Sequence, residues 1–237
     1  MNKPRKIAML ALGILALLVV QAYSAAPANA PRSLAPYFTP AAAGPKSPDK
    51  DGFIQRWLLL EPIGNSLRSN AGFTEAFVRG AFKTEYFPNQ FTVVPRNGDK
   101  VTVADKELAW HAVDSAQWNV KLFRFAYGLD KLVYGVTFWA VTVVDSPREM
   151  KNVRLAVGSN AASLWWLNGE EAVGLFGDRR MVMDDCISKR LTLKQGRNII
   201  RGAVINGPGM SDFCVRFIDE KGEPVKDITV NLENAGN

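Results

Sequence analysis

Short runs in which apolar and polar residues alternate fill the chain from residue 152 to residue 218, and turn sequences separate them. Asn168-Gly169 stands between two of these runs, and Gly196-Arg197-Asn198 stands between two others. Alternation with a period of two is typical of strands that bury one face, and Asn-Gly is favoured in tight hairpin turns. This stretch therefore predicts consecutive antiparallel strands of a β-sandwich.

Similar strand-like runs extend the predicted domain over residues 52–232. The one stretch with helical spacing is 70–82, which places Phe73, Phe77, Val78 and Phe82 on one side of a short helix. Helices do not alternate with the strands, so the fold class is all-β: an antiparallel β-sandwich of jelly-roll type with one short helix. The predicted strands are 52–60, 90–95, 101–103, 108–113, 120–127, 132–144, 153–157, 162–167, 172–176, 187–193, 199–205, 212–218 and 225–232.

The ends of the chain differ from this domain. Lys3, Arg5 and Lys6 precede an apolar run over 7–20 and then small residues, so 1–24 is predicted to be a secretory signal peptide. The run is shorter than the roughly 20 residues that span a bilayer, although an uncleaved anchor stays an alternative. We expect a secreted or periplasmic protein without stable membrane insertion after cleavage. Residues 25–51 are rich in Pro and Ala and predict an extended linker, and 233–237 form a tail.

The net charge argues against nucleic acid as a partner. The whole chain carries 29 basic and 23 acidic residues. Three basic residues leave with the signal peptide, so 26 basic and 23 acidic residues remain, a net charge of +3. These charges are scattered and form no basic run of the kind that follows a phosphate backbone.

The two cysteines, Cys186 and Cys214, both fall inside the predicted β-sandwich. In an oxidising compartment such a pair favours a disulfide. The alternative is two small buried apolar side chains.

Four motifs in this order resemble a known family. They are 57–63 (WLLLEPI), 164–170 (LWWLNGE), 191–200 (LTLKQGRNII) and 216–224 (RFIDEKGEP). Together they are similar to the galactose-binding-like jelly-roll modules of secreted bacterial polysaccharide-degrading proteins, and this resemblance implies carbohydrate binding. The chain departs from the family pattern at Glu61, where the family has Gly, in residues 159–162, which lack an acid, and in residues 201–203, which interrupt an apolar strand.

No catalytic residue is predicted. The chain lacks a Gly-x-Ser-x-Gly elbow, and its only histidine, His111, lies in a predicted strand, where a structural role is the favoured interpretation. A carbohydrate esterase of the acetylxylan esterase type, to which related modules are attached, stays an alternative.

One acidic pair, Asp184-Asp185, could bind a cation. Three interpretations of this pair are open: a solvated turn, a structural calcium site, or an acid and base pair. No other cofactor is predicted.

The predicted ligand-binding residues are Trp165, Arg179, Arg180 and Asn206. Adjacent residues of a strand face opposite sides, and the hairpin motif favours Trp166 as the core residue and Trp165 as the exposed one. Arg179, Arg180 and Asn206 lie in irregular connections, where recognition residues are common. The predicted function is a secreted, non-catalytic module that binds a polysaccharide or oligosaccharide. A structural or protein-interaction β-sandwich is the remaining alternative.

Overall fold

The computed structural model describes residues 32–65 and 69–232. The predicted signal peptide, the start of the predicted linker and the predicted tail lie outside these residues. The elements are β1 (Phe38–Pro40), β2 (Arg56–Leu60), β3 (Ile63–Gly64), η1 (Asn70–Gly72), α1 (Glu75–Lys83), β4 (Lys100–Val103), β5 (Lys106–Ser115), α2 (Leu122–Gly128), β6 (Val136–Ser146), β7 (Met150–Ser159), β8 (Ala162–Leu167), β9 (Glu170–Leu175), β10 (Cys186–Ile187), β11 (Leu191–Leu193), β12 (Gly196–Asn206), β13 (Phe213–Ile218) and β14 (Thr229–Val230).

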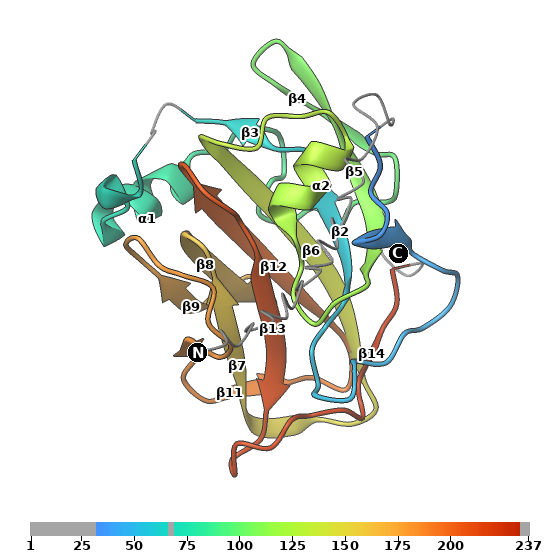
Figure 1. The fold of residues 1–237 in the computed structure, drawn as a ribbon. Coiled ribbons are helices and arrows are strands. Elements are labelled where there is room, and N and C mark those ends of the chain that lie inside the picture. The colour runs from blue at the N-terminus through green and yellow to red at the C-terminus, as the bar shows by residue number, and fades with distance from the viewer. Residues whose placement is uncertain (1–31, 66–68, 233–237) are drawn as a thin grey trace, which may run out of the picture. The chain divides into compact units, whose positions relative to one another are not determined.

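Two antiparallel sheets pack face to face (Figure 1). The larger sheet has ten strands with the central order β1-β5-β2-β6-β12-β8-β9; in addition, β3 and β14 pair with β6, and β4 pairs with β5. The smaller sheet has four strands, in which β10 and β11 pair with one edge of β7 and β13 pairs with the other. The predicted all-β antiparallel sandwich is therefore confirmed.

The longest pairing joins β6 and β12, which stay in register from Ser146 opposite Gly196 to Val136 opposite Asn206. Side chains of β6 are buried on both faces of the sheet, as the apolar run over 132–144 predicted. The inner face meets the four-stranded sheet in one apolar core. The outer face carries a second apolar cluster, which α1 and the irregular segment 84–95 cover.

Helix α1 confirms the predicted helical stretch. The side chain of Thr74 caps its first turn by accepting a hydrogen bond from the backbone N–H of Phe77. Val78 and Phe82, one turn apart, point into the outer cluster. The helix is therefore held by the sheet as well as by its own backbone.

Three predictions about elements are wrong. Residues 122–128 form the helix α2 rather than a strand, and Leu122, Phe125 and Ala126 are buried at helical spacing. Residues 90–95 form no strand. The sandwich also begins before residue 52, because β1 lies inside the predicted linker and pairs with β5.

The predicted disulfide is also wrong, because both cysteines are free. Cys186 in β10 and Cys214 in β13 lie on opposite sides of β7, where they pair with Val157 and Gly158. Strands in a sheet are about 4.8 Å apart, so the two cysteines are separated by about twice that distance, and a disulfide needs Cα atoms within about 7 Å.

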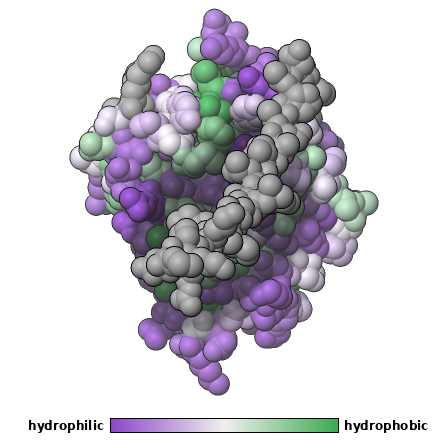
Figure 2. Space-filling model, viewed as in Figure 1, coloured by the Kyte–Doolittle hydropathy of each residue, from purple (hydrophilic) through white to green (hydrophobic). Residues whose placement is uncertain are grey.

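The outer surface is mostly hydrophilic in the view of Figure 2, with a strip of apolar surface at the end that carries β3 and β4. Within the part of the chain that the structure describes, no helix is long and apolar enough to cross a bilayer.

Candidate functional site

The structure exchanges the predicted roles of the two adjacent tryptophans. Trp165 is fully buried between the sheets, where its ring packs against Trp57 and Phe213 with centroid separations of 5.9 and 5.0 Å. Its Nε1 donates a hydrogen bond to the Oγ of Ser163. The prediction that Trp165 lies on the outer face is wrong, because a fully buried ring cannot stack on a ligand.

Gly202 makes this burial possible. It lies opposite Trp165 in the neighbouring strand β12, and a Cβ atom there would come within 2.3 Å of the indole ring. Gly202 belongs to residues 201–203, where the chain departs from the family pattern. This departure therefore provides the space for Trp165.

Trp166 points the other way, onto the outer face of the ten-stranded sheet, and is partly exposed. Its indole stacks on Trp139 with 5.9 Å between centroids and 16° between planes. Phe91 and Phe82 meet Trp139 edge-on from two further directions. These rings leave a hollow of about 210 Å³, the Trp166 pocket, which is lined by Arg79, Phe82, Lys83, Phe91, Leu164, Trp166 and Glu171.

Helix α1 supplies the charged groups of the Trp166 pocket. Arg79 and Lys83 are four residues apart and therefore lie on the same side of the helix. The Nε of Arg79 donates to Glu75 at 2.8 Å, and its Nη1 donates to both carboxylate oxygens of Glu171 at 2.8 and 2.7 Å. Glu171 comes from β9, so these bonds connect the helix to the sheet edge.

The guanidinium group of Arg79 is therefore held in one place before any ligand arrives. The hydrogen bonds that Arg79 donates to Glu171, and then the one it donates to Glu75, raise the pKa of Arg79 above its already high value, so the group is always charged. It also lies over the ring of Phe176, 5.2 Å from the centroid. A fixed planar donor beside an aromatic surface is suited to hydrogen bonding at the edge of a flat ligand.

The other predicted binding residues do not join this pocket. Arg179 forms an ion pair with Asp185 at 2.6 Å, and Arg180 is exposed in the same loop. Asn206 is fully buried, and its Nδ2 donates to the carbonyl oxygens of Gly207 and Gly209. Asn206 thus braces the 207–211 loop from within rather than facing solvent.

The predicted calcium ligands are each occupied by an arginine. Asp184 accepts hydrogen bonds from Arg216 at 3.1 Å, and Asp185 accepts them from Arg179. Two adjacent carboxylates that turn to different guanidinium groups do not present a shared set of oxygens. Within residues 32–65 and 69–232, no group of three or more His, Cys, Asp or Glu side chains is placed to hold a metal ion.

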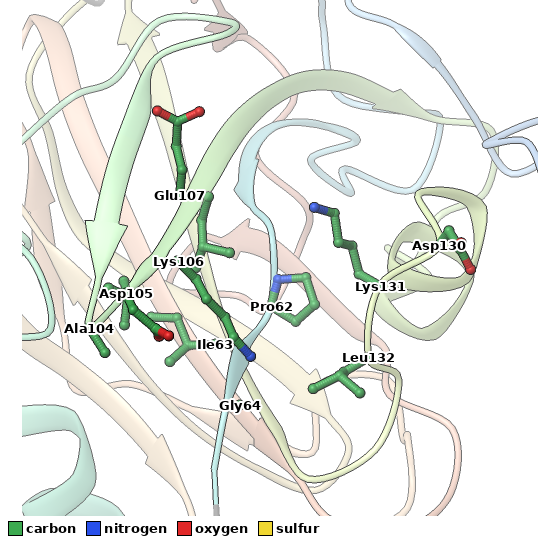
Figure 3. A pocket seen from close by; sticks show the side chains of 12 residues that line it. Pro62, Ile63, Gly64, Ala104, Asp105, Lys106, Glu107, Asp130, Lys131 and Leu132 are labelled. Carbon is green, nitrogen blue, oxygen red and sulfur yellow. The ribbon is translucent and has the colours of Figure 1, made fainter.

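A larger hollow of about 750 Å³ lies between the β4–β5 hairpin, β3 and the segment after α2 (Figure 3). Lys106 and Lys131 lie on opposite sides of Pro62 in this view. The described lining mixes both signs of charge with aliphatic groups and includes no aromatic ring, so it offers no stacking surface. It is lined by Pro62, Ile63, Gly64, Val103, Ala104, Asp105, Lys106, Glu107, Leu108, Asp130, Lys131 and Leu132.

Glu61 contacts both His111 and Lys131, and Lys131 is one of the residues that line this hollow. The Nε2 of His111 lies 3.3 Å from the Glu61 carboxylate, which also accepts a hydrogen bond from Lys131 Nζ at 2.9 Å. Burial alone would raise the pKa of Glu61, but the hydrogen bonds from Lys131 and His111 outweigh it and hold the pKa below its usual value. The histidine ring also packs edge-on against Phe125. The ring is thus held between a carboxylate and an aromatic ring.

Comparison with known proteins finds no family model that matches this chain and no curated protein that matches it. Among solved structures, the chain is similar to a PA14 sugar-binding domain from an RTX adhesin, with a TM-score of 0.42 and 11% identity over 73% of this chain and 95% of that one. It is similar to the PA14 domain of the MpAFP antifreeze protein, with a TM-score of 0.42 and 9% identity over 73% and 89%. A β-glucosidase from Kluyveromyces marxianus has a TM-score of 0.33 and 17% identity over 72% of this chain and 15% of that one.

Proposed function

We propose that this protein is a non-catalytic carbohydrate-binding module and that the Trp166 pocket is its binding site. Polysaccharides or oligosaccharides are the proposed ligands. The proposal includes export to the periplasm or beyond, which rests on the sequence of residues 1–24.

One observation carries the proposal: a partly exposed indole, supported from behind by a second indole, forms the floor of a small hollow. Sugar rings have apolar faces that pack on aromatic rings, while their hydroxyl groups need planar donors and acceptors at the edge. Pockets for drug-sized ligands measure about 300–1,000 Å³, so a hollow of about 210 Å³ suits one sugar unit. An outer face without aromatic rings would instead have favoured a purely structural sandwich.

The test compares Trp166→Ala with Tyr134→Ala. Tyr134 is 54% exposed and lies away from the Trp166 pocket, so it is a matched loss of a surface ring. We expect affinity electrophoresis and glycan arrays to show binding by the wild type and by Tyr134→Ala. Trp166→Ala should bind at least on the order of tenfold more weakly, as is usual for a central aromatic contact.

Two results would contradict the proposal. The wild type could fail to bind any of a broad set of polysaccharides, or Trp166→Ala could bind as well as the wild type. Thermal unfolding of each variant separates a lost contact from a lost fold.

A further inference from the structure

The Trp166 pocket offers more hydrogen-bond donors than acceptors. Both carboxylate oxygens of Glu171 already accept hydrogen bonds from Nη1 of Arg79. The hydrogen bonds that Arg79 donates to Glu75 and Glu171 come from its Nε and Nη1, and Lys83 lines the pocket as an exposed ammonium group. A ligand that satisfies this rim must therefore supply acceptors.

A further positively charged residue, Arg201, lies beside the pocket. Arg201 in β12 lies directly opposite Trp166 in β8 and is only 5% exposed. Its Nη2 donates to the carbonyl oxygen of Val93, while its Nη1 is buried without a partner in the residues described. Burial lowers the pKa of Arg201 to about 10, so it still carries a positive charge at neutral pH. A buried cation without a carboxylate partner favours negative charge nearby.

The charged groups at the site carry an excess of positive charge. In the pocket and directly beside it, Arg79, Lys83 and Arg201 are positive, while Glu75 and Glu171 are negative and both already pair with Arg79. Three positive charges against two negative ones leave a net charge of +1. A neutral sugar would leave this charge uncompensated, whereas a carboxylate would pair with it.

We infer that the sugar unit bound in the Trp166 pocket is acidic, a uronic acid whose ring packs on Trp166 and whose carboxylate meets Lys83 and Arg79. This inference rests on the proposed function and names its ligand class. Lys83 is then a specificity residue, because it supplies the unpaired charge, and Trp166 binds the ring whatever its charge.

The experiment uses polygalacturonate and its methyl ester as probes, because esterification removes the charge and keeps the sugar. Binding of the full chain is measured by affinity electrophoresis and calorimetry for the wild type, Lys83→Met, Trp166→Ala and Lys189→Met. Lys189 is an exposed lysine beside the four-stranded sheet and is the matched control. A second polyuronate, alginate, tests whether the preference follows the carboxylate rather than one sugar.

We expect the wild type to prefer polygalacturonate to its ester on the order of tenfold, as one charge-assisted contact allows. Lys83→Met should remove this preference while keeping ester binding, Lys189→Met should change neither, and Trp166→Ala should weaken both probes. Raising the salt concentration should weaken polygalacturonate binding and leave ester binding unchanged.

The contrary outcomes are distinct. Equal binding of acid and ester that depends on Trp166 would overturn the acidic ligand and keep the proposed function. The preference for polygalacturonate over its ester could survive in Lys83→Met, or Lys189→Met could also remove it. Either result would assign the preference to the overall surface charge of the protein rather than to Lys83. No binding of either polyuronate, together with Trp166-dependent binding of neutral glycans, would also overturn the acidic ligand. No binding of any glycan would overturn both proposals.

Discussion

At the residue scale, the face that each of two adjacent tryptophans occupies determines where a ligand can bind. Trp165 fills the space between the sheets and Trp166 forms the floor of a pocket on the outer face. Period-two alternation established that the two rings face opposite sides but could not establish which side is inner. Gly202 does so, because it leaves room for the Trp165 ring on the inner face of the neighbouring strand.

We therefore predict that Gly202→Ala destabilises the protein by about 2–3 kcal/mol, because the added methyl group would overlap the Trp165 ring. Urea unfolding measures this as a lower midpoint with an unchanged slope. The control is Gly80→Ala in α1, where nothing lies within 4 Å of the added Cβ and alanine favours the helix. Equal effects of the two changes would contradict the packing argument.

At the element scale, the sequence was informative about strands and about α1 but not about the cover of the outer face. Buried residues at helical spacing identified α1, whereas α2 is short and flanked by strand-like runs, so alternation was favoured there. The 84–95 segment contributes Phe91 and the carbonyl of Val93 without regular structure. Such a cover depends on packing against strands distant in sequence, so periodicity could not predict the pocket.

Helix α1 connects stability to binding, because it carries both Arg79 and Lys83. We predict that Thr74→Ala lowers the free energy of unfolding by about 1 kcal/mol through loss of the cap on Phe77 N–H. It should also weaken sugar binding, because the first turn holds Glu75 against Arg79. Calorimetry checks both effects, and Thr102→Ala, an exposed threonine in β4, is the control. A loss of stability without any change in affinity would separate the helix from the site.

At the scale of the whole molecule, buried carboxylates join parts of the chain that are distant in the sequence. Glu61 meets Lys131 and His111, and Asp114 accepts two hydrogen bonds from Arg56. Burial would raise the pKa of each carboxyl group, but these partners lower both pKa values below the usual range. In the unfolded chain both groups return to their ordinary pKa values near 4.

The sign of the pH dependence follows from these lowered pKa values. Stability from these pairs is fully present above the unfolded pKa and is lost as pH falls through the folded pKa. We predict that Glu61→Gln destabilises the protein most at neutral pH and that its difference from the wild type shrinks as the pH falls below about 4. Thermal unfolding across pH checks this, with the exposed Glu220→Gln as control. A difference that stays constant with pH would exclude the ionised pair as its cause.

The placement of Cys186 and Cys214 on either side of β7 has a practical consequence. Because the sandwich needs no covalent crosslink between them, its folding should be indifferent to the redox potential of its surroundings. Reductant should leave the unfolding temperature unchanged, and a bacterial cytoplasm should yield the same native fold as an oxidising compartment.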